Sequence, residues 1–163
     1  METKITSGYV SGDGHLVEPA DLWTTRMDKR FRDRAPRIDA RPDGDFILID
    51  DLPPWPVGSE GAMINDKTSG QIKSIGGYRY GANRPGAVDP RARLADQDLD
   101  NLRAEVIYPN VIGFLLFGIE DAELQRACIQ VFNDWVCEFG AVAPNRLLLV
   151  GILPAAGPVE WAI

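Results

Sequence analysis

The stretch Leu147-Leu148-Leu149-Val150-Gly151-Ile152-Leu153 is apolar throughout, without alternation of polar and apolar residues. This pattern is typical of a strand that is buried on both faces, as in a parallel sheet covered by helices. A helix is predicted before it, capped by Asp121 and ended by Pro144. One face of that helix carries an apolar stripe made of Leu124, Ala127, Cys128, Val131, Trp135, Phe139 and Val142. An amphipathic helix followed by a buried strand indicates a β/α fold.

Two earlier strands are expected, at residues 8–13 and 105–108, and Pro109 ends the second. Asp89-Pro90 predicts the start of a helix between them, because aspartate caps helices and proline suits the first helical position. The order is therefore strand, long insertion, helix, strand, helix, strand, which predicts an α/β fold with parallel strands.

The insertion spans residues 16–88 and has two parts. Residues 37–50 predict a β-hairpin that turns at Asp43-Gly44. Residues 51–88 are rich in glycine, proline, serine and asparagine and show no apolar period. A loop of that length is usually functional or disordered.

Composition excludes several classes of partner. The net charge of −7 argues against nucleic acid and against an anionic membrane surface, because both bind basic proteins. No segment is long and apolar enough to span a bilayer. Cys128 and Cys137 fall in one predicted helix, too far apart for a disulfide, and reduced cysteines fit a cytoplasmic protein.

Asp13-Gly14-His15 is the candidate functional motif, and His15 is the only histidine of the chain. Alternate side chains of a strand share a face, so Asp13 and His15 point the same way and can hold one divalent metal ion. The alternative is an Asp-Gly turn beside an exposed histidine. Glu18 follows closely and is a candidate third ligand, although Pro19 makes its orientation uncertain.

Three stretches together resemble one enzyme family: Val10–Pro19 with Asp21-Leu22-Trp23, Arg93–Asp98 running into Val106–Pro109, and Phe132–Trp135 through Pro144–Leu147 to Leu153-Pro154. The family is the amidohydrolase-related one of metal-dependent hydrolases and decarboxylases, in the branch close to aminocarboxymuconate-semialdehyde decarboxylase. The resemblance covers nearly the whole chain and is weakest over residues 51–88.

The resemblance implies a (β/α)8 barrel of the TIM type, of which this chain supplies the N-terminal portion, about three β/α units. Residues 1–163 are then one partial barrel domain, with 16–88 as a hairpin and loop insertion and possible lid. The metal ligands Asp13 and His15 carry over onto the first strand. The family's later ligands, a histidine and an aspartate from the fifth and eighth strands, have no counterpart here. We therefore expect a truncated chain without a complete site, inactive alone.

The implied cofactor is a divalent metal ion, zinc first, with manganese or iron as alternatives. The implied reaction is hydrolysis of a C–N or C–O bond, or decarboxylation, of a small carboxylated or aromatic substrate. The loops that follow barrel strands lie on the active-site side. Arg79 and Tyr108 are therefore candidate substrate-binding residues, and Trp55, Tyr78 and Tyr80 candidate lid residues; the alternatives are packing for Tyr108 and a subunit contact or disorder for the loop.

The competing hypothesis is a non-catalytic truncated module that self-associates or binds a partner. Three barrel strands leave sheet edges and apolar faces uncovered, which favours a homo-oligomer.

Overall fold

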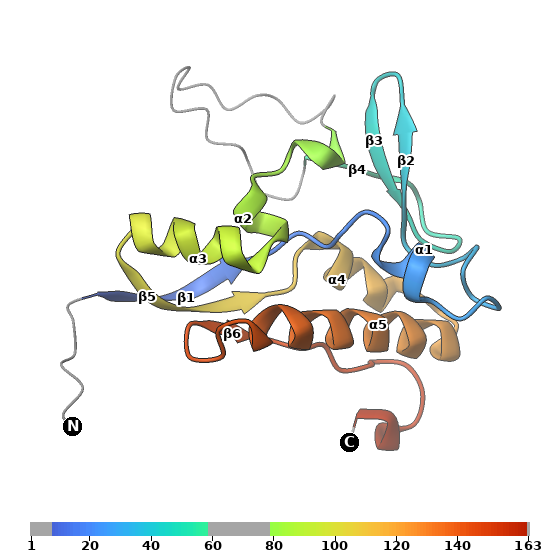
Figure 1. Cartoon of the computed structure of the whole chain (residues 1–163). Coiled ribbons are helices and arrows are strands. Elements are labelled where there is room, and N and C mark those ends of the chain that lie inside the picture. The colour runs from blue at the N-terminus through green and yellow to red at the C-terminus, as the bar shows by residue number, and fades with distance from the viewer. Residues whose placement is uncertain (1–7, 59–78, 163) are drawn as a thin grey trace.

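The computed structural model describes residues 8–58 and 79–162, and a parallel sheet lies at its centre (Figure 1). Strands β1 (Tyr9–His15), β5 (Leu102–Tyr108) and β6 (Leu147–Leu149) form this sheet in the order β1-β5-β6. Both neighbouring pairs run parallel. The prediction of an α/β fold with parallel strands is confirmed.

Two helices, α3 (Pro90–Leu99) and α5 (Ala122–Ala141), connect these strands. The predicted caps are present, because the Asp89 carboxylate accepts from the Ala92 amide and the Asp121 carboxylate accepts from the amides of Glu123 and Leu124. Between β5 and α5 the chain forms the short helix α4 (Val111–Leu115) and the 3-10 turn η2 (Leu116–Gly118).

Both long helices cover the same face of the sheet. Arg93 of α3 bonds Glu105 of β5. Gly140 of α5 lies against Leu149 of β6, which is the register neighbour of Ile107, two residues beyond Glu105. Side chains two residues apart in a strand share a face, so Glu105, Ile107 and Leu149 all point toward the helices.

The opposite face of the sheet is more open than the sequence predicts. Leu148 keeps 42% of its surface exposed, Tyr108 38% and Val10 61%. The prediction that residues 147–153 form a strand buried on both faces is therefore wrong. The run contributes only a short strand, Leu147–Leu149, and helices cover one of its two faces. An uninterrupted apolar run shows that both faces of a strand are apolar. It does not show whether helices or other parts of a closed barrel cover each face.

The insertion forms a small antiparallel sheet of its own. The predicted hairpin is present as β2 (Arg37–Arg41) and β3 (Gly44–Leu48), and β4 (Trp55–Pro56) pairs with β3. Its turn lies at Pro42-Asp43 rather than at the predicted Asp43-Gly44, because Gly44 already pairs with Arg41. Helix α1 (Leu22–Arg26) precedes the hairpin, and η1 (Tyr80–Ala82) and α2 (Pro85–Val88) close the insertion. The described parts of 51–88 thus contain short regular elements, which the sequence pattern did not indicate. Tyr78 lies outside the described residues.

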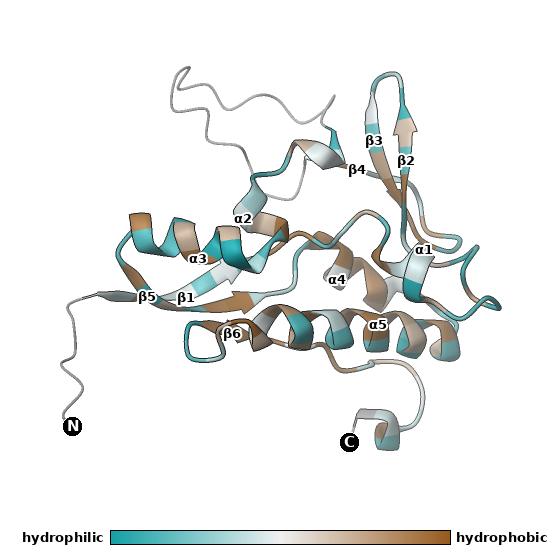
Figure 2. Cartoon of the chain, in the orientation of Figure 1, coloured by the Kyte–Doolittle hydropathy of each residue, from teal (hydrophilic) through white to brown (hydrophobic). Residues whose placement is uncertain are grey.

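One hydrophobic cluster joins the insertion to the sheet and helices. Its most deeply buried members include Trp23, Ile47, Ile107, Leu124 and Phe132. Figure 2 shows apolar residues along β5 and α4 and on part of each turn of α5. The amphipathic stripe predicted for α5 explains this burial, since Leu124, Cys128, Trp135 and Phe139 all face the core. Val142, the last residue of the predicted stripe, lies just beyond α5 and is 44% exposed. The last element of the described residues is a 3-10 turn, η3 (Val159–Ala162).

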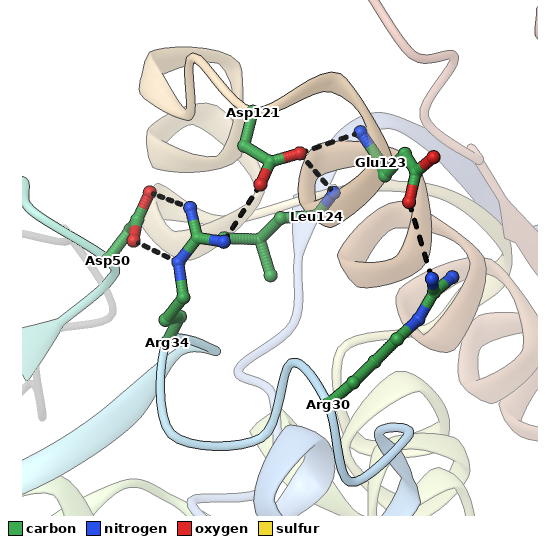
Figure 3. A network of polar contacts seen from close by, with 6 residues as sticks. All are labelled: Arg30, Arg34, Asp50, Asp121, Glu123 and Leu124. Carbon is green, nitrogen blue, oxygen red and sulfur yellow. Dashed lines mark hydrogen bonds and ion pairs between the residues drawn. The ribbon is translucent and has the colours of Figure 1, made fainter.

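Polar contacts tie the insertion to the first turn of α5 (Figure 3). The Arg34 guanidinium donates to both carboxylate oxygens of Asp50, at 2.7 and 3.1 Å, and to Asp121 at 2.8 Å. The hydrogen bond from Arg34 and those from the Leu124 and Glu123 amides hold the pKa of Asp121 below its ordinary value. Arg30 adds a second contact, with Glu123 at 3.3 Å.

Two predictions concerned membrane spans and the state of the cysteines. Among residues 8–58 and 79–162, no helix has the length and apolar character needed to cross a bilayer. Cys128 is buried and Cys137 exposed, and neither is in a disulfide.

Candidate metal centre

Asp13 and His15 lie together at the carboxyl end of β1. The Asp13 Oδ1 atom is 3.5 Å from the His15 Nε2 atom. The Asp13 side chain is 88% exposed and that of His15 45%, so both face solvent. The predicted pair is therefore brought together on one side of the strand.

An irregularity in the pairing of β1 and β5 accompanies this arrangement. Ser11 pairs with Glu105 and Gly14 with Ile107, so β1 has one more residue than β5 between these two points. Such a bulge bends its strand and re-aims the side chains in it. Asp13 lies inside the bulge, and simple alternation along the strand is therefore not the whole reason that it reaches His15.

The backbone of Pro109 fixes the tautomer of His15. The His15 Nδ1 atom lies 3.0 Å from the Pro109 carbonyl oxygen. A carbonyl only accepts hydrogen bonds, so Nδ1 carries the proton and donates. In the neutral ring the lone pair is then on Nε2, the atom beside Asp13. A histidine that ligates a metal is typically oriented in this way, through its other ring nitrogen.

The spacing of the pair also fits a metal ion. Two ligand atoms of a tetrahedral zinc site, each about 2.1 Å from the metal, lie about 3.4 Å from one another. The Asp13–His15 distance of 3.5 Å is close to this value, and it is also the spacing of a direct ion pair between the carboxylate and a protonated ring. In the described part of the chain, however, no group of three histidine, cysteine or acidic residues could hold a metal, so Glu18 does not complete the site. The residues present fit two positions of a coordination shell.

The two predicted substrate-binding residues have different surroundings. Tyr108 pairs with His15 across the strands, and the two ring centroids are 6.3 Å apart. Arg79 bonds instead to the hairpin: its guanidinium donates to Asp45 at 2.7 Å and to the carbonyl oxygens of Arg41 and Pro42. Burial would raise the pKa of Asp45, but the hydrogen bonds from the Tyr80 amide and from the Arg79 guanidinium outweigh it and hold this pKa below its ordinary value.

Sequence reasoning missed a buried acid beneath the site. Glu105 is 5% exposed, and its carboxylate accepts from Arg93 Nε at 2.8 Å, Arg93 Nη2 at 2.6 Å and Gln97 at 3.0 Å. Burial would raise the pKa of Glu105, but these bonds outweigh it and the pKa lies below its ordinary value. The signal available in the sequence was a charged residue within a strand otherwise expected to be buried.

Comparison with known proteins establishes the fold. No protein-family model matches the sequence, and no curated protein does. Among solved structures, an amidohydrolase from Mycobacterium avium subsp. paratuberculosis K-10 superimposes with a TM-score of 0.66 over 96% of this chain, at 19% identity. Over the matched region the chain shares the fold of that solved protein.

The matched region covers 45% of the solved amidohydrolase, so this chain spans less than half the length of that protein. At this level of identity the match concerns the fold. It supports the α/β class that the sequence predicted and shows a fold shared with one solved amidohydrolase.

Proposed function

We propose that this chain is the metal-binding N-terminal portion of an amidohydrolase-like enzyme, a metal-dependent hydrolase or decarboxylase. Asp13 and His15 are two of its metal ligands, and zinc is the expected metal. One observation carries the proposal: the His15 Nδ1 atom contacts the Pro109 carbonyl while its Nε2 atom faces the Asp13 carboxylate at 3.5 Å. Histidines that ligate a metal typically donate their other ring N–H to a carbonyl in this way, and this agreement supports the proposal.

Asp13 and His15 would hold the metal, which would supply Lewis acidity toward a substrate oxygen or a water molecule. The residues of the chain orient and bind. Pro109 holds the His15 ring in place, and Asp13 contributes negative charge at the open end of the sheet. Tyr108 presents an aromatic ring and a hydroxyl beside them. The Tyr108 ring suits an aromatic substrate. The proposed reaction is hydrolysis of a C–N or C–O bond, or decarboxylation, of a small carboxylated or aromatic substrate, and binding of a carboxylate there would depend on the positive charge of the metal.

The remaining ligands are proposed to come from further β/α units, which also cover the open face of the sheet. Two features support this. Asp13 and His15 lie on the same face of the sheet as Tyr108 and Leu148. Among the described residues, no long helix covers this face. The fold match extends over only part of the solved amidohydrolase. In a barrel of this type the uncovered face points inward and the strand ends form the active site.

A zinc titration followed by nitrogen-15 NMR tests the proposal. His15 is the only histidine, so an untagged sample shows one imidazole spin system and needs no assignment. Added zinc should shift the Nε2 signal and leave Nδ1 protonated. Asp13→Asn should weaken binding by at least about tenfold, since a ligand is lost. The exposed hairpin residue Asp43 gives the control, and Asp43→Asn should bind as the parent does. An Nε2 signal that ignores zinc, or equal binding by Asp13→Asn, would refute the assignment.

A second candidate function rests on the same open face. Val10, Tyr108 and Leu148 expose apolar surface there, and β1 and β6 are the outer strands of the parallel sheet. Such a surface favours self-association, as expected for a non-catalytic module. Sedimentation velocity tests the module hypothesis: Leu148→Lys should dissociate a self-associating species, whereas a chain that is monomeric across concentrations contradicts this hypothesis.

A further inference from the structure

Gly14 separates the two proposed ligands and rests directly on the buried carboxylate of Glu105. A Cβ atom added to Gly14 would lie 2.7 Å from Glu105 Cδ and 2.9 Å from Cγ. Non-bonded carbon atoms do not approach this closely, so either the strand β1 or the Glu105 carboxylate would have to move. Gly12, in the same strand, is different, because a Cβ there meets nothing within 4 Å. The close approach is therefore specific to the residue between Asp13 and His15.

Glu105 is held too firmly to move aside. Its two carboxylate oxygens accept both arms of the Arg93 fork, the geometry of a bidentate pair, and Gln97 adds a further bond. The Arg93 side chain is 17% exposed and that of Glu105 7%, so water does not screen the pair effectively. Arg93 and Gln97 both belong to α3. The position of this helix over the sheet therefore sets where the Glu105 carboxylate is held.

The position of this carboxylate coincides with the bulge. Glu105 is the register partner of Ser11, and the extra residue of β1 lies between Ser11 and Gly14. Asp13 precedes Gly14, and His15 follows it and reaches Pro109, the residue after the end of β5. A shift of β1 away from α3 would therefore move both side chains relative to Pro109.

We propose that Glu105, clamped by Arg93 and Gln97, is a positioning residue that acts through Gly14 to set the separation of Asp13 and His15 and the contact of His15 with Pro109. This inference rests on the proposed function for the role of the pair in metal binding. Its geometric part, the orientation of His15, is independent of metal.

Two variants and one control test the proposal in the full chain. Gly14→Ala places a methyl group against the carboxylate, and Arg93→Lys keeps the positive charge but removes the fork. Gly12→Ala adds the same methyl to the same strand in open space. The Nδ1-protonated population of His15 is measured by nitrogen-15 shifts without metal. The zinc dissociation constant is measured by titration, and the melting temperature by circular dichroism.

Gly14→Ala and Arg93→Lys should each lower the Nδ1-protonated population and weaken zinc binding roughly ten- to hundredfold, the effect typical of residues that orient a ligand. Gly12→Ala should change zinc affinity by less than about twofold. Lower melting temperatures with an unchanged tautomer and affinity would overturn the proposal, because Glu105 would then be structural only. If Gly14→Ala does not fold, Arg93→Lys decides alone. If the parent protein binds no zinc, the proposed function fails and the tautomer measurement still decides the positioning role.

Discussion

Replacing Arg93 by methionine removes the counter-ion of Glu105 while keeping most of the apolar stem. The carboxylate, 5% exposed, would retain only the bond from Gln97. Removing one partner of a buried pair costs about 3–5 kcal/mol when the remaining charge stays ionised. The folded protein can instead protonate the carboxyl, at about 1.4 kcal/mol for each pH unit above its ordinary pKa.

The smaller of these two costs sets the loss of stability. The ordinary pKa of a glutamate is 4.5, so protonation costs about 3.4 kcal/mol at pH 7 and about 1.4 kcal/mol at pH 5.5. We therefore expect Arg93→Met to lower the free energy of unfolding by about 3 kcal/mol at pH 7, and by less than half of that at pH 5.5.

The direction of the pH dependence follows from the two folded states. In the parent, the pKa of Glu105 is lowered on folding, so its stabilisation is present above 4.5 and is lost as the pH falls through the folded value. In Arg93→Met, burial without a counter-ion raises the pKa, so the variant loses stability as the pH rises above 4.5. The difference between the two proteins must widen from acid toward neutral pH.

Urea unfolding at the two pH values measures the difference, with the fluorescence of the buried residues Trp23 and Trp135 as signal. Arg26→Met is the matched control, because the Arg26–Glu138 pair has side chains that are 40% and 60% exposed and should contribute little. A loss below about 1 kcal/mol at pH 7, or a loss that stays constant with pH, would refute the account of Glu105 as a buried, paired carboxylate.

Three further outcomes are expected. Asn133→Ala should destabilise the chain by about 1–3 kcal/mol in thermal unfolding, because the amide bonds both the nitrogen and the oxygen of Ile152 at 2.8 Å; an unchanged melting curve would contradict those bonds. Cys137 should react with a thiol reagent at pH 8 while Cys128 stays protected until unfolding, because burial raises the pKa of Cys128 to about 12; two equally fast thiols would oppose this. The hydrogen bond from Arg34 lowers the pKa of Asp121, so the stabilisation that the Asp121 carboxylate gives is lost as the pH falls through this lowered pKa. Asp121→Asn should therefore lose less stability in acid than the parent does. Identical acid titrations of the two proteins would count against the contact.

The open face of the parallel sheet is a feature that the hydrophobic pattern of the sequence did not predict. The apolar run at residues 147–153 identified a parallel strand, but periodicity carries no information about which neighbour covers each face. Leu148 is therefore exposed here although its sequence environment is that of a core residue. Likewise, the loop at 51–88 has no apolar period, and its short elements arise from packing that includes Val57 and Tyr80 in the common core.

Local chemistry along the chain was sufficient for the caps at Asp89 and Asp121, the hairpin turn near Gly44 and the stripe of α5, because each depends on residues within a few positions of one another. The motif Asp13-Gly14-His15 was likewise visible as a pair of potential ligands. The tautomer of His15 and the support beneath Gly14 depend on Pro109 and Glu105, which are some 90 residues away in the sequence. Pairing of β1 with β5 brings these groups together, and contacts across a sheet are not encoded in any local pattern.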